Sequence, residues 1–161
     1  MTVTVVEKNP DDLSMTITAE FTAPVDRVWQ VWTDPRQLER WWGPPTYPAT
    51  VVDHDLAPGG RVSYYMTSPE GEKYHGWWRV LTVEAPGSLE FEDGFSDEQG
   101  NENRELPVTT VQVRLEPQGS GTVMTIRSRY ASAEAMQQLL EMGMEEGMTA
   151  ALGQIDELLA A

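Results

Sequence analysis

Few residues in this sequence carry side chains suited to catalysis. There are two histidines, His54 and His75, and no cysteine, so a cysteine nucleophile, thiolate metal sites and disulfides are excluded. Histidine titrates near neutral pH and can act as a general acid or base. In the strands expected below, His75 and Tyr65 could meet inside a hollow as an acid–base pair. The alternative is that His75 is exposed or hydrogen-bonded without any chemistry, and we assign no catalytic residue.

The other polar groups suggest no established type of site. Asp93 and Arg127 are the remaining groups that could support an enzyme, and Arg127 could also orient a ligand carboxylate. Asp53 and Asp55 lie on one face of their expected strand and His54 on the other, which is poor geometry for a shared metal. The sequence has no phosphate-binding glycine loop, zinc-binding helix motif or nucleophile elbow. We expect neither a metal nor a cofactor.

Aromatic rings are concentrated near one pair of prolines. The segment from Val31 to Pro45 reads VWTDPRQLERWWGPP. Its rings could fill a core, or they could line a hollow that another molecule enters. Trp41 and Trp42 occupy adjacent helical positions, which point about 100° apart. We therefore expect one ring in the core and the other at the rim of a cavity.

Methionine and glycine form two neighbouring stripes near the C-terminus. Met144 and Met148 belong to the apolar stripe, and Gly147 belongs to a stripe of small residues. Methionine fills irregular gaps, and a glycine inside a helix costs about 1 kcal/mol relative to alanine. The small residues either permit close contact with a sheet or leave space for a ligand. The candidate ligand-binding residues are Trp41, Trp42, Tyr65, Met66, His75, Trp77, Arg127, Met144, Gly147 and Met148.

The order of expected elements indicates how these residues are positioned. Residues 14–23 alternate as a half-buried strand does, and two short helices follow, the second capped by Asp34 with Pro35 at its first position. Six strand-like runs with short turns then predict antiparallel neighbours. They span residues 47–55, 60–68, 73–85, 88–95, 107–117 and 121–131. Residues 132–160 contain no proline and predict one long helix, capped by Ser132.

These elements predict an α+β fold. A twisted antiparallel sheet of about seven strands curls, and a helix of roughly 40 Å could cross its concave face. A rod against a curled sheet touches it along a line and leaves space at one side. We expect residues 1–161 to form a single domain.

Charge and hydropathy exclude several classes of partner. Eleven basic and 26 acidic residues give a formal net charge of −15, which opposes binding to nucleic acid or anionic lipid. No segment has the roughly 18 apolar residues of a membrane span, so membrane insertion is not expected. The N-terminal sequence lacks the features of a signal peptide, so we expect a cytoplasmic location.

Several motifs resemble the START-like superfamily, also called SRPBCC, which includes the birch-pollen-allergen-like proteins. They are EFTAPVDRVWQVWTDPRQLERWWGP, DLAPGGRVSYYM, EKYHGWWRVLTVEAPGSLEFED and GMTAALGQIDELL. The resemblance extends from about Ser14 to Leu159 and is greatest to the branch named for the activator of the heat-shock protein 90 ATPase. It implies a helix-grip fold with a hydrophobic cavity between the sheet and the last helix. Members bind lipids, sterols or polyketides, and some catalyse cyclisation or hydrolysis.

The sequence therefore supports one leading function and two alternatives. The leading prediction is a cytoplasmic protein that binds a small hydrophobic molecule, lipid- or polyketide-like, in the cavity. The first alternative is an enzyme, of cyclase or hydrolase type, acting on an apolar substrate in the same cavity. The second, which the resemblance implies, is a co-chaperone-like module that stimulates a chaperone ATPase and acts in the stress response.

Overall fold

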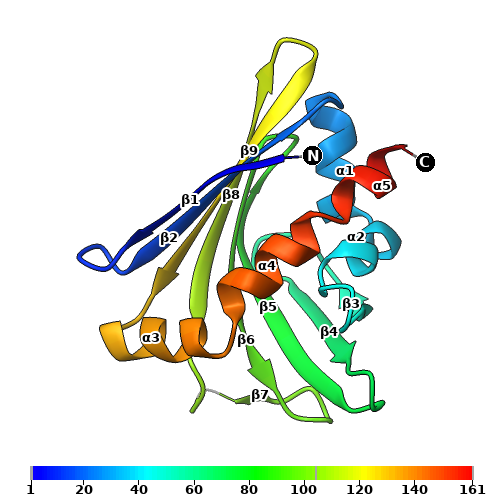
Figure 1. Cartoon of the computed structure of the whole chain (residues 1–161). Coiled ribbons are helices and arrows are strands. Elements are labelled where there is room, and N and C mark those ends of the chain that lie inside the picture. Colours follow the sequence, from blue (N-terminus) through cyan, green and yellow to red (C-terminus); the bar gives the residue numbers. More distant parts are fainter. Residues whose placement is uncertain (1, 104, 161) are drawn as a thin grey trace.

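The computed structural model describes residues 2–103 and 105–160, which form an α+β fold (Figure 1). Within these residues, nine antiparallel strands form one sheet, with the order β1-β2-β9-β8-β6-β5-β4-β3 and with β7 paired to β6. The strands are β1 (Thr2–Asn9), β2 (Ser14–Phe21), β3 (Ala49–His54), β4 (Arg61–Thr67), β5 (Lys73–Glu84), β6 (Ser88–Ser96), β7 (Glu102–Asn103), β8 (Thr109–Gln118) and β9 (Gly121–Tyr130). The helices are α1 (Val25–Thr33), α2 (Pro35–Trp41), α3 (Ala133–Glu141), α4 (Met144–Leu152) and α5 (Ile155–Ala160).

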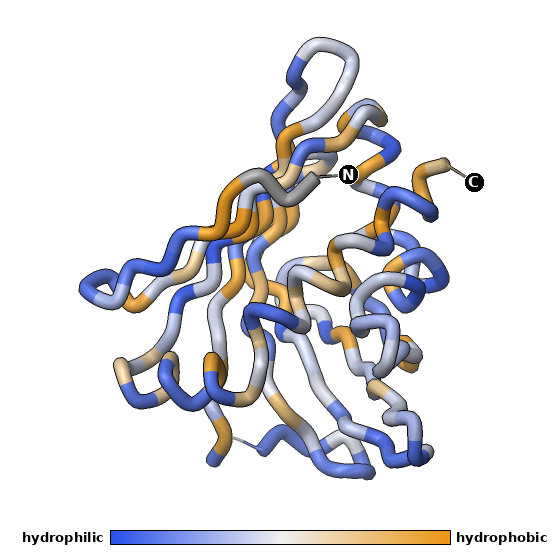
Figure 2. The backbone as a smooth tube through the Cα atoms, in the orientation of Figure 1, coloured by the Kyte–Doolittle hydropathy of each residue, from blue (hydrophilic) through white to orange (hydrophobic). Residues whose placement is uncertain are grey.

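The predicted helix-grip arrangement is confirmed. The sheet curves around the C-terminal helices, which cross one of its faces (Figure 1). The strand predicted from residue 14 and the six strand-like runs all appear, as β2, β3, β4, β5, β6, β8 and β9. Two strands were not predicted: β1, which forms a hairpin with β2, and the two-residue β7, which lies between β6 and β8 in the chain. Hydrophilic residues gather at the hairpin turns, and hydrophobic residues in the middle of the strands (Figure 2).

Helix α2 begins as the sequence predicts. The side chain of Asp34 accepts a hydrogen bond from the Arg36 backbone N–H at 2.9 Å, and Pro35 occupies the first turn. A hydrogen bond from the Gln37 side chain, together with the one from the Arg36 N–H, holds the pKa of Asp34 below its ordinary value. The cap fixes the direction of α2 and so brings its side chains to the edge of the sheet.

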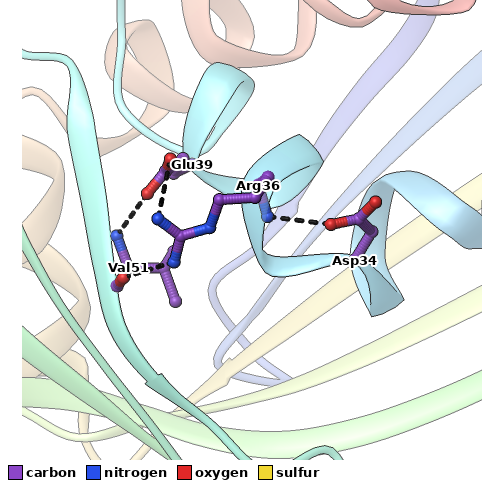
Figure 3. Close-up of polar contacts among 4 residues, drawn as sticks. All are labelled: Asp34, Arg36, Glu39 and Val51. Atoms are coloured by element: carbon purple, nitrogen blue, oxygen red, sulfur yellow. Dashed lines mark hydrogen bonds and ion pairs between the residues drawn. The ribbon is translucent and has the colours of Figure 1, made fainter.

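Two side chains of α2 form hydrogen bonds with the backbone of β3, which lies at one edge of the sheet (Figure 3). The Val51 backbone N–H donates to the Glu39 carboxylate at 3.0 Å, and Arg36 donates to the Val51 carbonyl at 2.9 Å. Arg36 and Glu39 also form an ion pair at 3.3 Å. Unpaired backbone groups at a sheet edge invite pairing with another chain, and these contacts satisfy both groups of Val51.

Replacing Glu39 with alanine should lower the free energy of unfolding by about 1–2 kcal/mol, because the Val51 N–H loses its acceptor. Urea unfolding followed by tryptophan fluorescence measures the loss. The matched control is Glu70→Ala, which removes the same side chain from an exposed turn. Equal losses in the two variants would contradict the role given to Glu39.

The C-terminal segment differs from the single long helix that the sequence predicts. It consists of α3, α4 and α5, and Gly143 separates the first two with a backbone φ of 86°, in the left-handed region. Glycine adopts this conformation without steric cost and commonly ends helices. The absence of proline from residues 132–160 does not guarantee one continuous helix, because glycine can also end a helix.

Polar contacts attach the far end of the C-terminal segment to the first two helices. Arg27 of α1 donates to the Leu158 carbonyl at 2.8 Å, and Gln154 donates to the Gly43 carbonyl at 2.6 Å. Ile155 and Leu158 of α5 are buried. This end is therefore anchored to both α1 and the residues after α2.

Candidate functional site

A cavity of about 290 Å³ lies between the sheet and the C-terminal segment. Its walls come from strands β4, β6, β8 and β9, from α3 and α4, and from the loops before β3 and β8. Most of the lining is apolar, and it includes Met66, Phe95, Val111, Leu139 and Met148. The arrangement is that of a small-molecule site, which is typically apolar with a few polar groups.

The hollow exists because the first half of α4 does not reach the sheet. Its buried residues, Ala151 and Leu152, lie in the second half, whereas Met144 and Met148 are only partly buried. A Cβ added at Gly147 would meet no atom within 4 Å. Of the two explanations for the small-residue stripe, the structure therefore favours open space at Gly147 over close contact with the sheet.

An aromatic cluster closes one end of the hollow. The ring of Trp42 meets Trp78 edge to face, with centroids 4.8 Å apart, and Trp78 stacks on Phe91 at 4.0 Å. Trp32 contacts Trp41 edge to face at 4.7 Å. Trp32, Trp41 and Trp78 are fully buried. These rings form the core at this end, and Trp42 is the member that also lines the cavity.

One pair of polar side chains, Tyr64 and Asp93, lines the cavity. The Tyr64 hydroxyl on β4 donates to Oδ1 of Asp93 on β6 at 2.9 Å. Strand β5 lies between these two strands, and its residue opposite Tyr64 is Gly76. A Cβ on Gly76 would lie 2.4 Å from the Tyr64 ring. The missing side chain thus allows Tyr64 to lean across β5 and reach Asp93.

Burial changes the titration of both groups. Removal from water, only partly offset by the hydrogen bond from Tyr64, raises the pKa of Asp93 to about 7. The same burial and the neighbouring Asp93 raise the pKa of Tyr64 well above its ordinary value. The nearby indole N–H of Trp42 lowers the pKa of Tyr64 in part, although it forms no hydrogen bond with the hydroxyl in this structure. Asp93 therefore changes charge near neutral pH, while Tyr64 remains protonated.

Comparison with protein families identifies the fold. Residues 22–160 match the family described as Activator of Hsp90 ATPase homolog 1-like protein. The chain belongs to this family. Proteins of the activator family have the START-like, or SRPBCC, fold, so the resemblance seen in the sequence is confirmed.

Solved structures of the activator-family type resemble the chain over nearly its whole length. A crystal structure from Mycobacterium smegmatis is 56% identical, has a TM-score of 0.91, and the match covers 98% of this chain and 97% of that one. A solution NMR structure from Arthrobacter aurescens is 55% identical with a TM-score of 0.95, over 99% and 92% of the two chains. A solution NMR structure from Staphylococcus epidermidis is 27% identical with a TM-score of 0.85, over 98% and 94%. No curated protein matches the chain.

Five of the ten residues predicted to bind ligand line the cavity of this activator-family protein. They are Trp42, Met66, Met144, Gly147 and Met148. Met66 lies on β4, Met144, Gly147 and Met148 lie on α4, and Trp42 directly follows α2. The apolar stripe and the small-residue stripe of the C-terminal segment were therefore the most informative features of the sequence.

The other five predicted residues lie away from the cavity. The Trp41 ring is buried in the core, where its N–H donates to the Val31 carbonyl at 2.8 Å. Tyr65 and His75 are register partners with ring centroids 5.5 Å apart, but with Trp77 they lie on the opposite face of β4 and β5 from Tyr64 and Gly76. Arg127 forms an ion pair with Asp12. The expected meeting of His75 and Tyr65 occurs, but outside the hollow.

Asp93, one of the two further groups that could support an enzyme, lies in the cavity, but Tyr64 was missed through the choice of strand face. Val62, Tyr64 and Met66 alternate with more polar positions along β4, and this alternation placed Tyr64 on the inner face. Tyr65 was chosen because it could pair with a histidine, although it shares its face with Arg61.

None of the helices in the described part of the chain is long and apolar enough to span a bilayer.

Proposed function

We propose that the chain, acting as a single domain in the cytoplasm, binds a small hydrophobic molecule between the sheet and α3–α4. The observation that carries this proposal is the open space beneath Gly147, within a cavity of about 290 Å³. Folded proteins rarely leave such a volume empty, since interiors pack as densely as organic crystals. Members of the family generally bind hydrophobic ligands or act as co-chaperone-like modules.

The size of the cavity limits its occupant. It lies near the lower end of the range for ligand pockets, roughly 300–1,000 Å³, and exceeds the ~150 Å³ that accommodates benzene. A lipid- or polyketide-like molecule of two or three rings, or a short acyl chain, fits this volume. Longer molecules would extend past the exposed side chain of Met142.

Binding of an uncharged apolar dye tests the proposal. Phenylnaphthylamine fluoresces strongly when it leaves water, and its titration with the protein should give a saturable signal for a single site. Native mass spectrometry of gently purified protein should then show a retained hydrophobic mass. A dye signal that rises linearly without saturation would count against the proposed function.

A second candidate, a co-chaperone-like module, is favoured by the description of the family. Such a module would act through its surface and would not need the cavity. Affinity capture on the immobilised protein, with the Gly147→Leu variant beside it, separates the two functions. A chaperone retained equally by both proteins at stoichiometric amounts would favour the co-chaperone.

A further inference from the structure

The cavity contains one carboxyl group and no compensating positive charge. Among the described residues that line it, only Asp93 and Tyr64 titrate, and none is Lys, Arg, His or Glu. Strand β8 contributes the Thr109 hydroxyl, β9 contributes the Ser128 hydroxyl, and the contributions of α3 and α4 are uncharged. Any ligand group placed beside Asp93 therefore meets this carboxyl in a largely apolar space that offers only hydroxyl groups besides it.

Half of the Asp93 carboxyl is free to contact a ligand. Oδ1 accepts the hydrogen bond of Tyr64, while Oδ2 has no partner among the described residues. Among the described residues, the buried side-chain atoms that lack a hydrogen-bond partner are the indole nitrogens of Trp42 and Trp78. Oδ2 also lacks a partner but is not one of these buried atoms, so protein atoms do not enclose it completely. Because Asp93 lines the cavity, this oxygen is open to its interior.

The chemistry of one free carboxyl oxygen discriminates among ligand groups. A hydroxyl can donate to an ionised carboxylate and can accept from a protonated carboxyl, so it suits both states. A ligand carboxylate would face a like charge at low dielectric. An ammonium has three donors, and apolar walls leave most of them unsatisfied at a cost.

We infer that Asp93, oriented by Tyr64, is the polar anchor of the cavity and selects an uncharged apolar molecule that carries a hydroxyl group over an acid of the same shape. This inference rests on the proposed function, because it requires that the cavity binds a small molecule. Tyr64 and Gly76 are positioning residues in this scheme. They determine which oxygen of Asp93 is free.

Competition between three probes of one shape tests the inference. The experiment measures how well naphthalene, naphthol and naphthoate displace phenylnaphthylamine from the wild-type protein. It is carried out at about pH 6 and about pH 8, on either side of the Asp93 pKa of about 7. At the higher pH, naphthol should bind about tenfold more tightly than naphthalene, the effect of one hydrogen bond to a charged group. The affinity for naphthoate should fall by up to about tenfold from the lower to the higher pH, because the protonated fraction of Asp93 falls by about that factor, while that for naphthol changes much less.

Variants assign this pattern to the anchor. Asp93→Asn keeps the shape and should abolish the pH dependence of naphthoate binding, whereas the matched control Asp11→Asn, in an exposed turn, should retain it. Tyr64→Phe should move the midpoint of the dependence to higher pH, because the hydrogen bond from Tyr64 lowers the Asp93 pKa.

The outcomes separate this inference from the proposed function. Failure of the dye itself to bind overturns both. Dye binding with equal affinities for the three probes, or with naphthoate favoured over naphthol at about pH 8, overturns the anchor and leaves the cavity function standing. Loss of the pH dependence in Asp11→Asn as well would also overturn it.

Discussion

Replacing Gly147 with leucine should reduce the affinity for an apolar ligand at least tenfold while leaving the protein folded. A Cβ at this position meets open space, so the leucine side chain can extend into the cavity and occupy the volume of the ligand. The same change removes a glycine from the interior of α4, which should raise the free energy of unfolding by up to about 1 kcal/mol. Dye titration measures the affinity, and urea unfolding measures the stability.

The matched control for this variant lies on the same helix. Ala150 of α4 is exposed, so Ala150→Leu adds a leucine there without filling the cavity. It should bind the dye as the wild-type protein does. Gly147→Ala should gain stability with little loss of affinity. Undiminished dye binding by Gly147→Leu would contradict the assignment of the cavity as the binding site.

Replacing Asp93 with asparagine should stabilise the protein at about pH 8 by up to about 4 kcal/mol. The pKa of Asp93 is raised from 3.8 to about 7 in the folded protein, so the folded state binds the proton more tightly than the unfolded state does. Each pKa unit corresponds to about 1.4 kcal/mol. The neutral amide avoids the cost of a buried charge and can still accept the hydrogen bond from Tyr64.

The sign of the pH dependence follows from the raised pKa. In the wild-type protein this contribution to stability is fully present below 3.8 and is lost as the pH rises to about 7. The gain of Asp93→Asn should therefore appear across this interval and disappear at about pH 4. Unfolding by urea at a series of pH values, with Asp11→Asn for comparison, measures it. A difference from wild type that stays constant with pH would contradict the buried state of Asp93.

Local sequence patterns were sufficient to predict most elements. The alternation in the strand-like runs and the capping residues Asp34 and Ser132 depend on backbone geometry within a few residues, and the structure contains both caps. The break at Gly143 was missed, although it too is local. Glycine permits the left-handed conformation that ends the helix but does not require it, so the presence of a glycine does not by itself predict a break.

The sequence by itself determined the α+β fold, the family and the part of the C-terminal segment that borders a hollow. It did so because side-chain periodicity specifies which face of an element is apolar. Only the tertiary structure decided that Tyr64 reaches Asp93 across Gly76. Those three residues come from three strands, and their contact depends on sheet order and register, which no local pattern encodes.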